Sequence, residues 1–219
     1  MGVAFGVPCA EEFAEDARLL RAGTPAVRVA MLGDAAVSYG VGVRDDASYL
    51  AMAKAAGLAV ARRTTGGTGV LHAPGDLAWT VVLPKGHPAA GRDYVHAYAR
   101  LGAGAVRFLH DRGVTAAWGA PPGVSDDFCF LSARGEVLAT GARVVGGAAQ
   151  HVTRDALLHQ GVLPLHVDRR WIQMLFGLPA PLLAERLVGL RELGVRDRPE
   201  TLAQELADAL SRSFGLDGT

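Results

Sequence analysis

Residues 62–76 read RRTTGGTGVLHAPGD, and this segment decides how the rest of the chain is interpreted. An apolar run at 58–61 precedes it and a second at 77–83 follows it. Short apolar runs bounded by glycine and proline are typical of β-strands. The segment is therefore predicted to be a long loop, with one short strand of its own, between two strands.

The loop combines glycines with positive charge, which makes it a candidate ligand site. Three glycines allow positive φ and a close approach of the backbone to a ligand: Gly66, Gly67 and Gly69. Successive N–H groups in such a turn bind anions, and Arg62 and Arg63 add positive charge beside them. His72 follows closely and suggests an anionic, activated acyl compound as the ligand. The alternative is a hairpin turn with two solvated arginines.

Outside this segment the apolar pattern changes between strand and helix periods. Strands are predicted at 27–32, 37–41, 58–61, 77–83, 128–131, 136–139, 143–150 and 157–165. Helices are predicted at 11–21, 47–56, 91–112, 171–176, 181–187 and 201–214. Asp45 and Asp46 are expected to cap the second helix, and 133–135 to turn a hairpin. The order of elements predicts an α+β fold, with helices packed on a mixed β-sheet.

Length and composition limit the class of protein. With 219 residues, half of them apolar, the chain can bury one substantial core and is expected to be one domain, 1–219. Twenty-two acidic residues balance 22 Lys plus Arg, so no nucleic-acid partner is expected. No secretory signal or membrane span is recognisable, and two cysteines favour reduced thiols. These features predict a cytoplasmic protein.

The central segment resembles the signature of the biotin and lipoate protein ligase superfamily, which includes lipoate-protein ligases and octanoyltransferases. Its HAPGDL stretch is similar to HGPGQL in one octanoyltransferase branch. Three further stretches resemble family segments in the same order: VSYG at 37–40, GARVVGGAAQ at 141–150 and LLHQG at 157–161. The resemblance implies the mixed-sheet fold of the superfamily's catalytic domain, and 187–194 resembles the end of that domain. No C-terminal accessory domain is therefore expected.

The resemblance also implies a reaction and its partners. The family transfers an octanoyl or lipoyl group to a lysine of a lipoyl carrier domain, in a 2-oxoacid dehydrogenase E2 or the glycine cleavage H protein. The donor is a thioester on acyl carrier protein or an acyl-adenylate made with ATP and magnesium. No tightly bound cofactor is expected. No metal site is expected either, because His72, Cys129 and His159 lack ligand spacing.

Cys129 is the candidate nucleophile, because its Cys-Phe context resembles octanoyltransferases that pass the acyl group through an enzyme thioester. The alternative is a small buried side chain between Phe128 and Phe130. Cys9 is expected to lie in a frayed N-terminus without a role.

Arg143 is the second catalytic candidate, and it stands where the family carries a lysine. Arginine keeps the charge but forks its donors and cannot shuttle a proton near neutral pH. The alternative is an exposed arginine on a strand. The candidate substrate-binding residues are Arg62, Arg63, Thr65, Gly66, Gly67, Thr68, His72, Gly146, Gly147 and His159.

Three functions remain open from the sequence. The first is octanoyl or lipoyl transfer through Cys129. The second is an ATP-dependent lipoate-protein ligase. The third is a non-catalytic acyl-binding relative, which the arginine at position 143 motivates.

Overall fold

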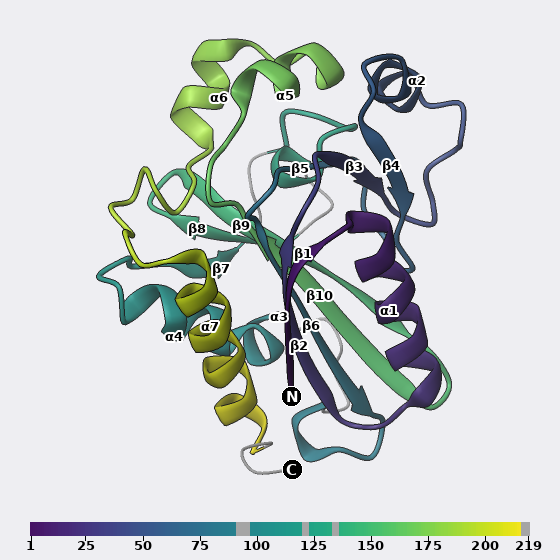
Figure 1. Cartoon of the computed structure of the whole chain (residues 1–219), viewed down its shortest axis with the longest axis vertical. Helices are drawn as coiled ribbons and strands as arrows, with labels where there is room; N and C mark the ends of the chain where they lie inside the picture. Colours follow the sequence, from purple (N-terminus) through teal and green to yellow (C-terminus); the bar gives the residue numbers. More distant parts are fainter. Residues whose placement is uncertain (91–96, 120–122, 133–135, 216–219) are drawn as a thin grey trace.

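A seven-stranded mixed sheet forms the centre of the protein (Figure 1). The computed structural model describes residues 1–90, 97–119, 123–132 and 136–215. In spatial order the strands are β1 (Gly2–Val7), β2 (Ala26–Leu32), β6 (Leu77–Pro84), β10 (Ala156–Leu163), β9 (Arg143–Val152), β8 (Glu136–Thr140) and β7 (Ala117–Gly119). The β1–β2 pair is parallel, and the other neighbouring pairs are antiparallel.

A second, three-stranded sheet carries the glycine segment. Its order is β4 (Ala59–Arg62), β3 (Ala36–Tyr39) and β5 (Val70–His72). Strand β3 pairs parallel with β4 and antiparallel with β5. Residues 63–69 connect β4 to β5, so the loop with one short strand is confirmed.

The helices cover the sheets on both sides. They are α1 (Cys9–Ala22), α2 (Ser48–Ala55), α3 (Ala97–Leu101), α4 (Ala103–His110), α5 (Arg169–Phe176), α6 (Ala180–Arg186) and α7 (Pro199–Phe214). The described residues also contain two 3₁₀ turns: η1 (Pro88–Ala90), between β6 and α3, and η2 (Cys129–Leu131), between β7 and β8. Figure 1 shows α4 and α7 together on one side of the large sheet and α1 on the other. No helix within the described ranges combines the length and apolar character that a membrane span needs.

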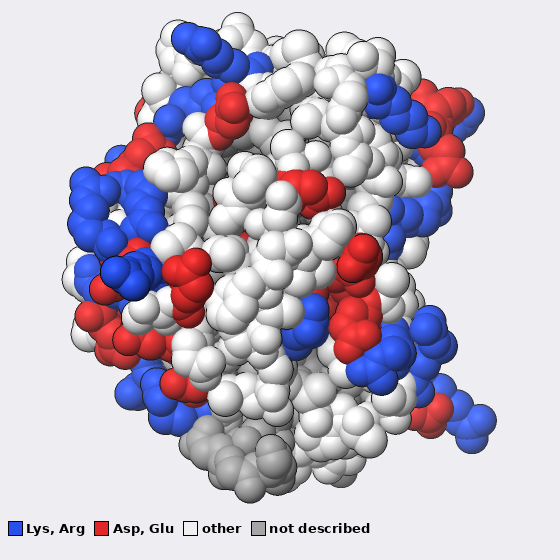
Figure 2. Space-filling model, in the orientation of Figure 1, with Lys and Arg blue, Asp and Glu red and all other residues white. Residues whose placement is uncertain are grey.

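Alternation along β6 explains why the large sheet is covered on both faces. Leu77, Trp79, Val81 and Leu83 enter the main core beneath α4 and α7, and each is at most 1% exposed. Burying one such side chain contributes about 1.5–3 kcal/mol. Thr80 on the opposite face donates a hydrogen bond to α1. Figure 2 shows most charged side chains toward the left and right edges of this face, with a mostly white middle that carries a few acidic groups.

The prediction of one continuous helix at 91–112 is wrong, because the helix is interrupted. Within the described part of that range, α3 ends at Leu101 and α4 begins at Ala103. The Trp118 ring packs against Gly102, where a Cβ would come within 2.1 Å of it. Residues 91–96 lie outside the described residues. A large indole from β7 therefore occupies the space that a side chain at the helix junction would need.

The strand predicted at 128–131 is also wrong, since Cys129–Leu131 forms the 3₁₀ turn η2. Its start is held by the glycine segment, because Cys129 N donates to Gly69 O at 2.8 Å and Gly69 N donates to Asp127 O at 2.8 Å. The predicted hairpin fails with it: β8 pairs with β7 and β9 instead. The turn expected at 133–135 lies outside the described residues.

Two smaller expectations are wrong at the N-terminal side. Cys9 does not lie in a frayed terminus: it follows β1, begins α1 and is 0% exposed. Asp45 and Asp46 do not cap α2, whose N-cap is Ala47 without a side-chain hydrogen bond. Asp46 instead pairs with Arg44 of the same loop, and Asp45 pairs with Arg62 at the end of β4.

Candidate active site

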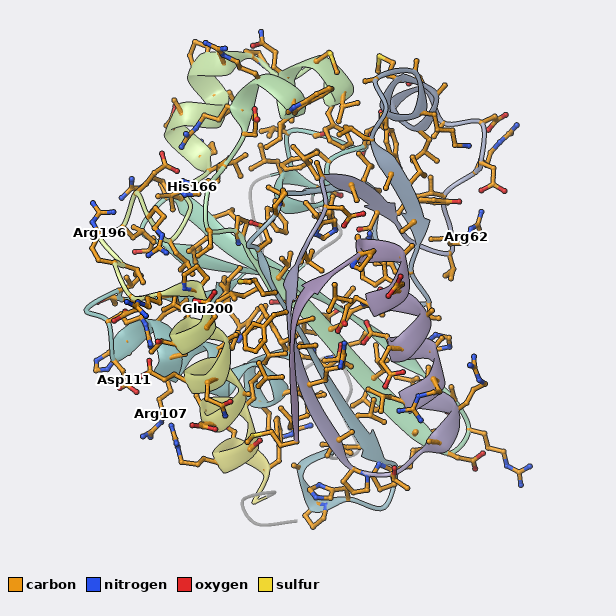
Figure 3. All side chains as sticks on the ribbon, viewed as in Figure 1. Arg62, Arg107, Asp111, His166, Arg196 and Glu200 are labelled. Carbon is orange, nitrogen blue, oxygen red and sulfur yellow. The ribbon has the colours of Figure 1, made fainter. Side chains whose placement is uncertain are left out.

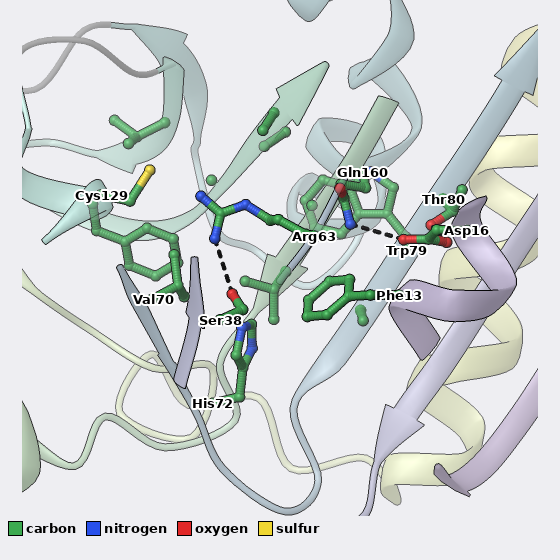
Figure 4. A pocket seen from close by; sticks show the side chains of 18 of the residues that line it. Phe13, Asp16, Ser38, Arg63, Val70, His72, Trp79, Thr80, Cys129 and Gln160 are labelled. Atoms are coloured by element: carbon green, nitrogen blue, oxygen red, sulfur yellow. Dashed lines mark hydrogen bonds between the residues drawn. The ribbon is translucent and has the colours of Figure 1, made fainter. Parts of the chain in front are cut away.

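An apolar cavity lies between the large sheet, the small sheet and α1 (Figure 4). It contains about 540 Å³ of space free of atoms, a figure that includes open solvent at its mouth. Its apolar walls include Phe13, Val70, Trp79, Phe130, Val137 and Val162. Figure 4 shows Cys129 and Asp16 at opposite ends, with Arg63 between them.

Arg63 is a buried cation held by neutral oxygens. The side chain is 4% exposed, and its guanidinium donates to Gly66 O at 3.0 Å, Thr68 O at 2.8 Å and Ser38 Oγ at 3.0 Å. Among the residues that the structure describes, no carboxylate forms an ion pair with it. Burial lowers the pKa of Arg63, and the Cys129 sulfur opposes that effect. A buried guanidinium without a carboxylate is suited to an anionic ligand or a developing oxyanion.

Gly67 brings the thiol and the guanidinium together. Its φ is +89°, and a Cβ built on it would lie 2.7 Å from Arg63 Nη2 and 3.0 Å from Cys129 Sγ. The two groups are therefore neighbours across a residue that has no side chain. Cys129 is partly exposed, so this end of the cavity is its outer end.

His72 reaches Arg63 through one hydroxyl. Its Nε2 lies 2.8 Å from Ser38 Oγ, which accepts a hydrogen bond from Arg63 Nη1. Burial and, less strongly, Arg63 lower the pKa of His72 to about 3. The ring is therefore neutral at physiological pH, and its hydrogen bond goes to Ser38.

The inner end of the cavity is polar. Asp16 Oδ1 accepts from Thr80 Oγ1 at 2.5 Å, and Asp16 Oδ2 accepts from Gln160 Nε2 at 2.8 Å. Thr65 Oγ1 in turn donates to Gln160 Oε1 at 2.7 Å. Through this contact the glycine segment is linked to α1 and to strand β10.

Several predicted binding residues shape the cavity through their backbones. Gly67 borders both Arg63 and Cys129, while the carbonyls of Gly66 and Thr68 hold Arg63. Gly147 lines the cavity, and a Cβ there would come within 3.0 Å of the Phe130 ring. A Cβ on Gly146 would come within 2.5 Å of Val162 O.

Four predicted site residues line the cavity: Arg63, His72, Cys129 and Gly147. Arg62, Arg143 and His159 are among those that do not. Arg62 is exposed, pairs with Asp45 at 2.6 Å and sits at the outer edge in Figure 3. Arg143 is exposed at the start of β9. His159 is 0% exposed and contacts the rings of Trp79, Tyr98 and Trp118. Burial lowers the pKa of His159 to about 3.

Residues 9–213 match a family described as the lipoyl protein ligase A/B catalytic domain. The chain belongs to this family. The match covers α1, the small sheet, the large sheet apart from β1, and the residues around the cavity.

The relatives within this family include octanoyltransferases. The chain is 34% identical over 118 residues to octanoyltransferase LipM of Exiguobacterium sp., covering 50% of this chain and 42% of the relative. It is 29% identical over 175 residues to LipM of Anoxybacillus flavithermus, covering 72% and 62%. The alignments therefore span less than two thirds of the length of these curated relatives.

Solved structures show the same fold. A lipoate protein ligase from T. acidophilum with bound lipoic acid superposes with a TM-score of 0.76 at 20% identity, covering 98% of this chain and 85% of that one. Lipoate-protein ligase A bound with ATP gives a TM-score of 0.72 at 20% identity, covering 99% and 85%. At this identity the likeness concerns the fold.

Five polar residues of the cavity lining were not predicted as site residues in this member of the lipoyl ligase family: Asp16, Ser38, Thr80, Glu136 and Gln160. Ser38 and Gln160 lie within the VSYG and LLHQG segments, so the family motifs contained a signal for both. Asp16 looks like one more acidic residue on the polar face of a helix, and Thr80 like part of an apolar strand. Only the packing of α1 on the sheet shows that they meet.

Proposed function

We propose that this chain is an acyltransferase of protein lipoylation, which moves an octanoyl or lipoyl group to a lysine of a carrier domain through a thioester on Cys129. One observation carries the proposal: the Cys129 sulfur and the buried Arg63 guanidinium are neighbours across Gly67 at the outer end of an apolar cavity. A thiol, a positive charge and a space for an aliphatic chain are the three parts that thioester exchange requires.

The reaction follows in two balanced steps. The Cys129 thiolate attacks the carbonyl carbon of the donor thioester, and the tetrahedral oxyanion collapses as the C–S bond to the donor thiolate breaks. The neutral amine of the carrier lysine then attacks the Cys129 thioester. The amide bond forms as the C–S bond to Cys129 breaks. The proton lost by the amine is taken up by the released Cys129 thiolate or by water.

Arg63 is the candidate for stabilising both oxyanions, since three oxygens fix its guanidinium and no carboxylate among the described residues forms an ion pair with it. His72 would be a positioning residue: it holds the Ser38 hydroxyl, which in turn holds the Arg63 guanidinium. Arg143, exposed and away from the cavity lining, is better placed to contact the donor or carrier protein than the reacting carbonyl.

The partner in this proposal is a lipoyl carrier domain. A related structure describes a lipoate protein ligase of Thermoplasma acidophilum together with its E2 lipoyl domain. We extend that pairing to this chain, and propose that 1–219 acts as one catalytic domain with an octanoyl thioester as donor. ATP and lipoate would serve only if the chain acts as a ligase.

The test is acylation followed by transfer. Incubation with octanoyl-acyl carrier protein should add one octanoyl mass to Cys129, and a lipoyl domain added afterwards should take it up on its lysine. Cys129→Ala should lose both signals. Absence of both acylation and transfer by wild type would refute the proposal, and transfer by Cys129→Ala from ATP and lipoate would replace it with the ligase reaction.

A further inference from the structure

The inner end of the cavity carries a hydrogen-bonded group of four side chains, which we name the inner polar cluster: Asp16, Thr65, Thr80 and Gln160. Each is at most 6% exposed. The cluster runs from Thr65 to Gln160, then to Asp16 and Thr80, with distances of 2.5–2.8 Å. Three of the four, Asp16, Thr80 and Gln160, line the cavity.

A purely aliphatic ligand does not need such an end. A buried polar group is costly unless it is hydrogen-bonded, whereas apolar side chains would receive a methyl end without needing any partner. Two hydrogen bonds to Asp16 leave part of its acceptor capacity unused, because a carboxyl group offers about four acceptor sites when ionised. The protonated acid would have a donor as well.

The charge on Asp16 is strongly disfavoured. Burial raises the pKa of Asp16 well above its usual value, and the nearby Glu12 carboxylate adds to the rise. Arg28 Nε and Nη2 both donate to Glu12 Oε2, at 2.9 and 2.7 Å, so that cation is already engaged. The inner end is thus polar without being strongly anionic, which suits a neutral hydrogen-bonding ligand.

We propose that the inner polar cluster selects acyl groups that carry a hydrogen-bonding group, a hydroxyl or a thiol, at the end remote from the carboxyl. This inference rests on the proposed function, because it places the acyl carbonyl at Arg63 and Cys129. The chain then runs along the apolar walls, and its far end meets Asp16 and Thr80. A hydroxyl there can donate to the carboxyl oxygen or accept from the acid.

The competing explanation is structural, since the same hydrogen bonds fasten α1 to the large sheet. A purely structural cluster would change stability when altered but would not distinguish two ligands of equal length. The informative quantity is therefore a ratio: the affinity for an ω-hydroxy acid divided by the affinity for the unsubstituted acid of the same carbon count.

The experiment measures this ratio by titration calorimetry with free acids of six, eight and ten carbons, each with and without a terminal hydroxyl. For the chain length that fits best, wild type should bind the hydroxy acid at least as tightly as the plain acid. Thr80→Val, which keeps the shape but removes the hydroxyl, and Asp16→Leu should each lower the ratio roughly threefold to tenfold, as expected for one lost hydrogen bond. Thr80→Ser should stay near wild type.

Two results would overturn the inference: a wild-type preference of tenfold or more for the plain acid at every length, or an unchanged ratio in both Thr80→Val and Asp16→Leu. Thermal melts identify a variant that fails to fold, in which case the ratio of the other decides. Failure of the acyltransfer proposal would be seen in a different measurement, because Cys129 would then remain unacylated by octanoyl-acyl carrier protein whichever free acid binds.

Discussion

Replacing Gly67 with alanine tests the contact between the thiol and the guanidinium most directly. Gly67 has φ +89°, which L-residues rarely adopt, and the new methyl would lie 2.7 Å from Arg63 Nη2 and 3.0 Å from Cys129 Sγ. A Cβ cannot remain at such distances, so Arg63 or Cys129 has to move.

Two costs add in this variant. The left-handed backbone costs about 1–2 kcal/mol for alanine, and overpacking in a tight site costs about 1–3 kcal/mol. The free energy of unfolding should therefore fall by about 2–5 kcal/mol, out of about 5–15 kcal/mol for a domain of ordinary stability. Acylation of Cys129 should slow by roughly 10- to 100-fold, because a displacement near 1 Å at a reacting group costs up to about 100-fold.

Gly57→Ala is the matched control. Gly57 also has a positive φ, +76°, but nothing lies within 4 Å of its Cβ position. It should lose stability through the backbone alone and acylate at the wild-type rate. The assay is intact-mass spectrometry of the octanoyl adduct over time, with thermal melts of both variants. If Gly67→Ala acylates as fast as Gly57→Ala, the reasoning that places Arg63 and Cys129 in one site is wrong.

Three further changes test other parts of the structure. Burial raises the pKa of Asp76 from 3.8 to about 7, so the folded state retains a proton that the unfolded chain releases, and this stabilising contribution is lost as pH rises through 7. The melting temperature of wild type minus that of Asp76→Asn should therefore fall between pH 5 and pH 8 in calorimetry, and a constant difference would contradict this. Arg28→Ala leaves Glu12 buried without its cation and should lower the free energy of urea unfolding by about 3–5 kcal/mol. Arg18→Ala breaks an exposed ion pair and should lower it by less than about 1 kcal/mol. Equal losses in the two variants would contradict the expectation that the buried pair contributes more than the exposed one. Arg143→Lys should leave the rate of Cys129 acylation within about twofold, and a tenfold change would place Arg143 at the reacting carbonyl.

Local patterns predicted most of the fold. The apolar run around Thr80 and the amphipathic helix around Phe13 were readable because a strand buried on both faces is apolar throughout and a helix packed on a sheet is apolar along one side. The missed features depend on partners distant in sequence. Cys129 begins a 3₁₀ turn because Gly69, sixty positions earlier, takes its N–H, and Gly102 ends a helix because Trp118 lies against it.

The candidate site was predictable in its types of residue but not in its grouping. Motifs identified the glycine segment and Cys129, and the structure brings both to one cavity. Sequence could not tell the two neighbouring arginines apart, because burial depends on how the end of β4 packs: Arg63 is 4% exposed, whereas Arg62 is exposed. Asp16 was missed because an acidic residue on a helix ordinarily faces water.

The unequal settings of the two cysteines have a practical consequence. Cys9 is 0% exposed, and burial together with Asp34 raises the pKa of its thiol, while Cys129 is partly open to solvent. An alkylating reagent applied to the folded protein should modify one sulfur and spare the other. Titration of the wild-type protein with iodoacetamide would therefore measure the fraction of molecules with a free, accessible Cys129 thiol. An octanoyl donor added first should protect this thiol from alkylation.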